Sequence, residues 1–218
     1  MIQTETAEVI FQVLKEKYGD IGTALLYKTP FQLLIATILS AQTTDVQVNR
    51  ITPRLFADYP DALSMGDLSK EKLEEYIKGC GLYHNKAKNI LAAASVIWEK
   101  YGGEVPSDRE SLTSLPGVGR KTANVVLSNA FGLPALAVDT HVTRVANRLG
   151  LAQGKDPLKI EEQICRLLPE EQWGQAHHWL IWFGRQICKS QKPLCLECPL
   201  KSYCSFVPPE SSSNARRV

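Results

Sequence analysis

Apolar residues recur at three- and four-residue steps along most of the chain, a spacing that places them on one side of an α-helix. The first such stripe predicts an amphipathic helix from Thr4 to Tyr18. Pro30 opens the segment 31–40, which is apolar nearly all round and predicts a buried central helix. Further helices are expected over 46–56, 69–77, 85–101, from Ser107 or Asp108 to 112, and over 121–131, 140–149, 157–168 and 173–188. No stretch alternates as a strand does, so we expect an all-α fold.

Between two of these helices lies the Gly-rich stretch 115–123, LPGVGRKTA. Gly117 and Gly119 permit positive φ and can bring main-chain N–H groups to the surface. The helix that follows adds unpaired N–H donors and the positive end of its dipole. Such a site can bind a backbone phosphate without any net positive charge. The alternative is an ordinary tight turn, which an isolated Gly-x-Gly also indicates.

Two ionisable residues stand at helix starts, Lys121 within this stretch and Asp139 one helix later. The helix dipole disfavours a protonated amine at Lys121, and a neutral amine is a nucleophile that can form a Schiff base. Asp139 precedes the helix 140–149, where it can cap free N–H groups. Its carboxylate could also take a proton from the amine and stabilise positive charge on a sugar. A solvated lysine and a purely capping aspartate are the alternative interpretations.

Four cysteines near the C-terminus have the spacing of a metal centre. An iron–sulfur cluster is favoured over zinc, because zinc sites normally use two close cysteine pairs and only one is present here. Lys189 and Lys192 lie in the longest gap and would form a rigid cationic finger for phosphate, with a redox role for the cluster as the competing interpretation. The four ligands would be Cys188, Cys195, Cys198 and Cys204.

Composition adds limits on size, charge and location. The chain has 218 residues, 44% of them hydrophobic, which suffices for one large or two modest cores. A net charge of only +2 requires any nucleic-acid site to concentrate its basic residues on one face. The longest apolar run, near 31–39, is too short for a bilayer or a secretory signal, so we expect a cytosolic protein. Disulfides are rare in the cytosol, and Cys80 and Cys165 are expected to be buried free thiols.

Together the stretch 115–123, the segment Val138-Asp-Thr-His141 and the cysteine spacing resemble the endonuclease III family of helix-hairpin-helix DNA glycosylases with lyase activity. The resemblance covers the chain except its polar tail, 208–218, which we expect to be disordered. It implies two helical domains with a DNA-binding cleft between them. One domain would span 22–134, and 1–21 with 135–207 would form the other, including an iron–sulfur loop over 188–204.

The resemblance implies base excision repair of double-stranded DNA by a monomeric, bacterial, nucleoid-associated enzyme with a 4Fe–4S cluster. Lys121 would attack C1′ of a flipped-out damaged nucleotide, and Asp139 would assist from across the cleft. The resulting imine would allow β-elimination of the 3′-phosphate. Oxidised, ring-saturated pyrimidines are the implied substrates.

Flipping a nucleotide leaves a gap in the duplex, and the resemblance assigns two residues to it. Gln42 would pair with the orphaned base, and Leu82, on a glycine-flanked tip, would hold the gap open. Turn polarity at Gln42 and core packing at Leu82 are the alternatives. His141 is expected to give hydrogen-bonding support. The full set of expected DNA contacts is Gln42, Leu82, Gly117, Gly119, Arg120, His141, Lys189 and Lys192.

Two other functions compete with this interpretation. The adenine-specific sister glycosylase shares the hairpin and the cluster. However, Thr37 stands where that family has a catalytic glutamate, and the residues after Cys204 are too few for its C-terminal recognition domain. A non-catalytic DNA-binding iron–sulfur protein would use the hairpin only to hold phosphate. Lys121 and Asp139 argue against that second alternative.

Overall fold

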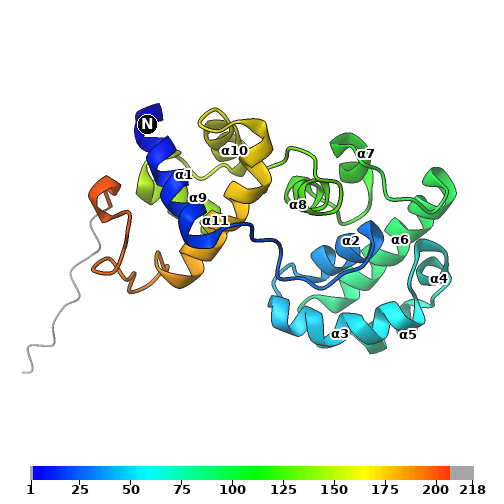
Figure 1. Ribbon diagram of the computed structural model, residues 1–218. Coiled ribbons are helices and arrows are strands. Elements are labelled where there is room, and N and C mark those ends of the chain that lie inside the picture. Colours follow the sequence, from blue (N-terminus) through cyan, green and yellow to red (C-terminus); the bar gives the residue numbers. More distant parts are fainter. Residues whose placement is uncertain (1, 207–218) are drawn as a thin grey trace, which may run out of the picture. The chain divides into compact units, whose positions relative to one another are not determined.

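The computed structural model describes residues 2–206, and that part of the chain is helical with no strand (Figure 1). This confirms the all-α prediction, whereas the polar tail 208–218 lies outside the described residues. No helix in the described range is long and apolar enough to cross a membrane. The helices are α1 (Thr4–Tyr18), α2 (Pro30–Leu39), α3 (Asp45–Asp58), α4 (Ala62–Gly66), α5 (Lys70–Ile77), α6 (Tyr83–Tyr101), α7 (Arg109–Ser114), α8 (Arg120–Ala130), α9 (Thr140–Leu149), α10 (Pro157–Cys165) and α11 (Trp173–Gln186), with 3-10 turns at Glu170–Gln172 and Lys201–Tyr203.

The sequence pattern misses one helix, α4. A helix of five residues is too short to display a periodic apolar stripe, so its signal lies in the cap instead. The Asp61 carboxylate accepts the Ser64 N–H at 2.9 Å, and the Ser64 hydroxyl faces the Asp61 N–H in return. This capping box starts the helix at Ala62.

The described chain divides into two compact units. The first contains the N-terminal helix, Val138–Pro169 and the chain from Ala176 onward. The second contains Ile21–Ala137 together with Glu170–Gln175. The domain limits expected from the sequence stay a prediction.

In the second unit, α2 lies at the centre of the core. Thr29 caps it by accepting the Gln32 N–H, and Pro30 fixes its first turn. Every residue of α2 after Pro30 is buried, because α3, α6 and α8 all pack against it. The prediction of a buried central helix is therefore confirmed. Helices α4 and α5 pack on α6, and α7 packs on α8.

The first unit consists of α1, α9, α10 and α11 from Ala176 onward, with the C-terminal loop that carries the cysteines. Trp179 of α11 is buried and donates its indole N–H to the Gly19 carbonyl at 2.9 Å, which joins α11 to the end of α1. Helix α9 presents a buried stripe of Val142, Val145, Ala146 and Leu149. Its amphipathic character fixes which residues of α9 face outward, and Asp139 stands at its N-terminus.

Candidate functional site

The Gly-rich stretch forms the hairpin between α7 and α8. Gly117 has φ 77°, a left-handed conformation that favours glycine. A Cβ atom placed on Gly117 would lie 2.7 Å from the Asn89 Cβ and 2.9 Å from its Nδ2. Val118 is buried beneath the turn, and its N–H donates to the Leu115 carbonyl at 3.1 Å. Both the backbone angle and the space therefore require glycine at position 117.

Gly119 does not adopt the positive φ that a glycine permits. Its φ is −92°, an ordinary extended angle, and it is the N-cap of α8. A Cβ atom there would meet nothing within 4 Å. The main chain at the start of α8 is thus open to solvent, and Gly119, Arg120 and Lys121 are all exposed. An anion can approach the main chain at this helix start closely.

A buried asparagine that the sequence analysis missed holds α8 in place. Asn124 is 0% exposed, accepts the Arg109 Nε–H at 3.0 Å and donates to the Leu136 carbonyl at 2.8 Å. These bonds join α7, α8 and the segment that follows them. The signal was present in the sequence, because Asn124 is a polar residue among Ala123, Val125 and Val126. A buried side-chain amide of this kind must be paired, and here its partners set the position of the hairpin.

The turns that carry Gln42 and Leu82 have an uncommon backbone. In residues 2–206, the non-glycine residues with positive φ are Gln42 at 53°, Leu82 at 58° and Lys192 at 48°. All three are predicted DNA contacts, and such strained conformations concentrate at functional sites. The side chain of Leu82 is 57% exposed, which excludes the alternative that it packs in the core.

The structure brings the Gln42 and Leu82 turns together within the second unit. The Gly81 N–H donates to the Thr43 hydroxyl at 3.2 Å. A Cβ atom on Gly81 would lie 3.2 Å from the Gln42 carbonyl oxygen, so the two backbones are in contact. An amide and an exposed apolar side chain therefore project from adjoining turns that are far apart in sequence.

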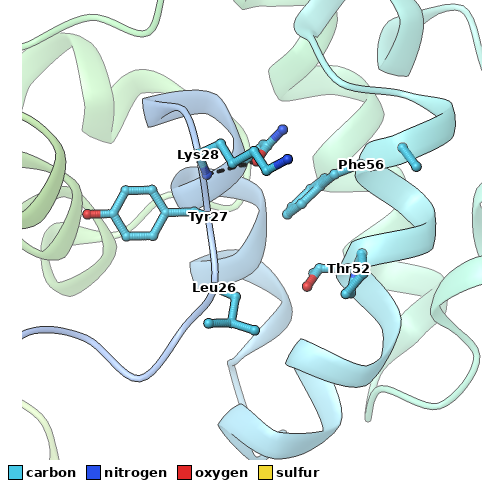
Figure 2. Close-up of a pocket in the computed structure, with 8 residues that line it drawn as sticks. Leu26, Tyr27, Lys28, Thr52 and Phe56 are labelled. Carbon is cyan, nitrogen blue, oxygen red and sulfur yellow. Dashed lines mark hydrogen bonds between the residues drawn. The ribbon is translucent and has the colours of Figure 1, made fainter.

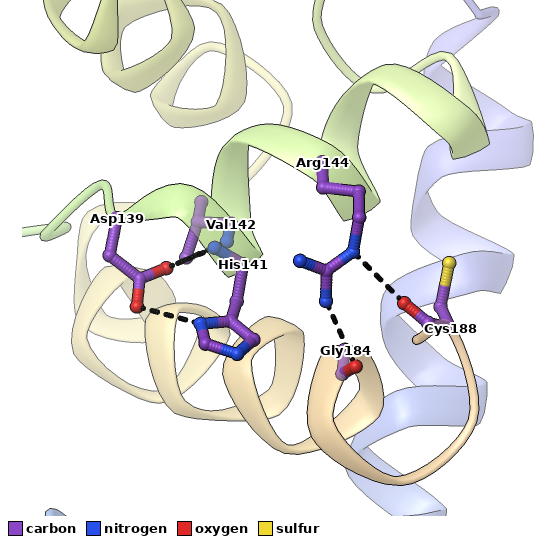
Figure 3. A network of polar contacts seen from close by, with 6 residues as sticks. All are labelled: Asp139, His141, Val142, Arg144, Gly184 and Cys188. Carbon is purple, nitrogen blue, oxygen red and sulfur yellow. Dashed lines mark hydrogen bonds and ion pairs between the residues drawn. The ribbon is translucent and has the colours of Figure 1, made fainter. Parts of the chain in front are cut away.

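Asp139 caps α9 and also pairs with His141 (Figure 3). Its Oδ1 accepts the N–H groups of His141 and Val142, each at 2.8 Å, while Oδ2 lies 3.2 Å from the His141 Nδ1. The capping interpretation is therefore confirmed, and it holds the carboxylate in one orientation. Asp139 also lines an open hollow of about 500 Å³ with Arg144 and Lys155, so a ligand can reach this end of α9.

Two arginines of α9, neither singled out from the sequence, brace the cysteine loop. Arg144 donates from Nε to the Cys188 carbonyl at 3.1 Å and from Nη2 to the Gly184 carbonyl at 2.9 Å (Figure 3). Arg148 donates to the carbonyls of Lys189 at 2.7 Å and Ser190 at 3.1 Å. One helix thus positions both Asp139 and the start of the cysteine loop. Lys189 and Lys192 are exposed on that loop.

The four C-terminal cysteines lie near one another. Burial raises the pKa of the Cys198 and Cys204 thiols, and repulsion from the neighbouring thiolates raises it further. Four thiolates held together need a cationic centre, which an iron–sulfur cluster supplies. In residues 2–206, no three or more His, Cys, Asp or Glu side chains converge tightly enough for a single metal ion. A cluster of several irons is wider than one ion and needs no such convergence.

Comparisons with known proteins match this architecture. Residues 35–170 match the HhH-GPD superfamily of base excision DNA repair proteins, and residues 188–204 match the iron-sulfur binding domain of endonuclease III. Endonuclease III of Rickettsia conorii is 47% identical over 94% of this chain and 98% of that protein. The enzyme of that name from Bacillus subtilis is 48% identical over 94% of both chains. The chain belongs to the endonuclease III family.

Solved structures agree with this assignment to endonuclease III. A trapped endonuclease III–DNA covalent intermediate has a TM-score of 0.91 and 45% identity, covering 94% of this chain and 97% of that one. A non-covalent endonuclease III–DNA complex has the same score and identity, covering 94% and 96%. A thermostable thymine-DNA glycosylase is 27% identical with a TM-score of 0.82 over 93% and 96% of the two chains. The helix-hairpin-helix fold expected from the sequence is confirmed.

Membership of the endonuclease III family decides between the alternatives left open above. The cysteines Cys188, Cys195, Cys198 and Cys204 fit a 4Fe–4S cluster, which confirms the choice of cluster over zinc. Neither the adenine-specific sister glycosylase nor a non-catalytic binding protein is favoured. Thr37 is buried and donates its hydroxyl to the Leu33 carbonyl at 2.7 Å, so it offers no carboxylate.

The comparisons with known proteins leave several other features of the chain untested. Lys121 belongs to the second unit and Asp139 to the first, and their expected approach across a cleft stays a prediction. Cys80 is a buried free thiol as expected, but Cys165 is only partly buried. A pocket of about 370 Å³ lies in the second unit and contains none of the predicted site residues (Figure 2). It is lined by Leu26, Tyr27, Lys28, Gln32, Thr52, Pro53, Phe56 and Ala57.

Proposed function

We propose that this member of the endonuclease III family removes damaged bases from double-stranded DNA and cleaves the resulting abasic site with Lys121 as the attacking amine. The observation that carries the assignment is an exposed amine on the first turn of α8, two residues beyond the open main chain of Gly119. A phosphate bound at that helix start would hold the sugar next to the amine. The same backbone thus serves binding and chemistry.

The reaction proceeds through a Schiff base. The Lys121 nitrogen forms a bond to C1′, and the damaged base leaves with the electron pair of the glycosidic bond and takes up a proton. Ring opening gives an imine between the lysine and C1′. Loss of a C2′ proton then breaks the C3′–O bond, and the 3′-phosphate departs. Water hydrolyses the imine and returns the free amine.

Asp139 is the assisting carboxylate in this scheme. It takes the proton that the Lys121 amine must lose and stabilises positive charge on the sugar. The two N–H groups that bind Oδ1 fix the orientation of the carboxylate, and His141 orients Oδ2. Capping and catalysis are therefore compatible roles, because the cap bonds and the His141 contact hold the carboxylate in one orientation.

The DNA contacts divide between backbone and gap. Gly117, Gly119 and Arg120 of the hairpin hold phosphate, and so do Lys189 and Lys192 of the cysteine loop. When bound, the 4Fe–4S cluster cross-links its loop and so keeps those two lysines rigid. Gln42 and Leu82 fill the gap left by the flipped nucleotide, the first with hydrogen bonds and the second with apolar surface. Oxidised, ring-saturated pyrimidines are the substrates we assign, and the bacterial nucleoid is the place of action.

Borohydride trapping tests the assignment of Lys121. Wild-type protein incubated with an abasic-site duplex and borohydride should give a covalent adduct, because reduction converts the imine to a stable amine. The adduct should vanish in Lys121→Ala and persist in Lys100→Ala, a control at an exposed lysine on α6. An undiminished adduct in Lys121→Ala would remove the lysine from the mechanism. A panel of single-lesion duplexes then ranks the bases released.

A further inference from the structure

Lys86 is a buried lysine that the mechanism above does not use. It lies in the first turn of α6, and its side chain is only 5% exposed. Burial lowers the pKa of Lys86 below the ordinary value for lysine. The amine Nζ donates to the Leu39 carbonyl at 2.8 Å and to the Thr43 hydroxyl at 2.9 Å. Lysines are almost never fully buried unless they are paired, so the burial of Lys86 at this place requires an explanation.

The bonds of Lys86 bracket the turn that carries Gln42. Leu39 is the last residue of α2, where the carbonyls that lack an intrahelical partner form the negative end of the helix dipole and attract a cation. Thr43 is the residue after Gln42 and precedes the N-cap of α3. A single ammonium group thus joins both ends of the turn whose central residue has a left-handed backbone.

Lys86 is also hydrogen-bonded to the turn that carries Leu82. Its own main-chain N–H donates to the Leu82 carbonyl at 3.1 Å. The Thr43 hydroxyl that accepts from Nζ also accepts the Gly81 N–H at 3.2 Å. Lys86 and Thr43 therefore form a clamp between two turns that adjoin in space but are distant in sequence. An apolar side chain of the same length would fill the space but make none of these bonds.

We propose that Lys86 is a positioning residue that holds Gln42 and Leu82 at a fixed separation before DNA binds. The inference rests on the proposed role of those two residues in the gap of the damaged duplex. Left-handed backbone at non-glycine residues persists only where the surroundings determine it strongly. The clamp of Lys86 and Thr43 holds both turns in that backbone conformation. Because Gln42 and Leu82 are then already ordered, they lose less conformational freedom when they enter DNA.

The first test compares Lys86→Met with the wild type in binding to two duplexes. One contains a tetrahydrofuran abasic analogue opposite 2-aminopurine, and the other is undamaged. Affinity for the abasic duplex should fall roughly tenfold, with undamaged DNA changed less than about twofold, because only the lesion duplex uses the two turns. The 2-aminopurine fluorescence at saturation should also change, since the orphaned base loses its ordered partner. Lys100→Met is the matched control and should bind both duplexes as the wild type does.

A double-mutant cycle separates positioning from a general loss of folding. If Lys86 acts through the gap-filling residues, Lys86→Met should cost little further affinity in a protein that already carries Gln42→Ala and Leu82→Ala. An undiminished additional loss would overturn the inference, as would equal weakening for both duplexes or none for either. If Lys86→Met does not fold, the isosteric Thr43→Val decides by the same criteria, since it removes the shared hydroxyl.

The two levels of hypothesis fail in different ways. A wild-type protein that gives no borohydride adduct and does not prefer the abasic duplex would contradict the proposed function. A wild type with both properties, whose lesion affinity is insensitive to Lys86→Met, would contradict only the role of the clamp.

Discussion

The two hairpin glycines give a matched pair of substitutions with different expected effects, one on stability and the other on DNA binding. Gly117→Ala places a methyl group 2.7 Å from the Asn89 Cβ on a backbone with φ 77°. Gly119→Ala places the same group in open space on a backbone with φ −92°. The two positions are separated by one residue, so they share the same hairpin and the same solvent. Any difference in stability or DNA affinity between the two variants therefore comes from the local backbone angle and the contacts of the added methyl group.

The expected magnitudes follow from those two environments. At Gly117, left-handed backbone costs alanine roughly 1–2 kcal/mol, and forcing the Asn89 side chain aside costs roughly 1–3 kcal/mol more. Reduced freedom of the unfolded chain returns about 0.4–1 kcal/mol. The net loss in free energy of unfolding is therefore about 1–5 kcal/mol. At Gly119 only the poorer N-cap propensity of alanine opposes that entropic gain, so the net change is within about 1 kcal/mol.

Urea denaturation followed by circular dichroism measures the stabilities, and salt titrations of binding to undamaged duplex measure phosphate contact. Gly117→Ala should lower the urea midpoint. Gly119→Ala should keep the midpoint but weaken DNA binding, because its methyl group projects where a phosphate would approach the main chain. Equal destabilisation by the two substitutions would refute the backbone argument. Unchanged binding in Gly119→Ala would refute the open main chain as a phosphate site.

Three further predictions concern buried or capping polar groups. Asp139→Asn should keep thermal stability, because the amide oxygen can still cap α9, but abolish borohydride trapping, whereas Asp139→Ala should also cost about 1 kcal/mol in denaturant unfolding. Burial, with His177 nearby, lowers the pKa of His178 from 6.5 to about 3, so the folded state favours the neutral ring. Stability should therefore be complete above pH 6.5 and fall by about 2 kcal/mol at pH 5, and urea midpoints of His178→Asn should lack that loss. Asn124→Ala should cost about 2–3 kcal/mol in urea unfolding because it removes two buried hydrogen bonds, one from the Arg109 Nε–H and one to the Leu136 carbonyl.

The sequence predicts the helices well where an apolar stripe repeats along the segment. A buried stripe repeats every three or four residues, so α1 and α9 have the expected bounds, and α2 is the buried central helix that its continuous apolar run indicates. Helix α4 lacks the length for such a stripe, and only its capping box marks it. Periodicity therefore predicts long helices, while short ones depend on side-chain bonds that many turns could also make.

The candidate site is less accessible to sequence reasoning. A Gly-x-Gly pattern does not reveal which glycine is obligatory, because the Asn89 side chain that excludes a Cβ from position 117 comes from another helix. The functions of Lys86 and Asn124 were missed for the same reason. A lysine in a sequence is expected on the surface, and only the fold shows that its partners are the carbonyl of Leu39 and the hydroxyl of Thr43.

The net charge of this protein does not indicate whether it binds DNA, because some of its basic residues bond to the chain's own carbonyls. Lys86 donates to the main chain at the end of α2, and Arg148 donates to the carbonyls of Lys189 and Ser190. Each of these cations holds a turn beside a non-glycine residue of positive φ, Gln42 in one case and Lys192 in the other. The arrangement separates two uses of positive charge, since Lys86 and Arg148 bond to the backbone while the exposed Lys189 and Lys192 can contact phosphate. A chain of net charge +2 can therefore be built to bind DNA, provided that its internal cations fix where the external ones stand.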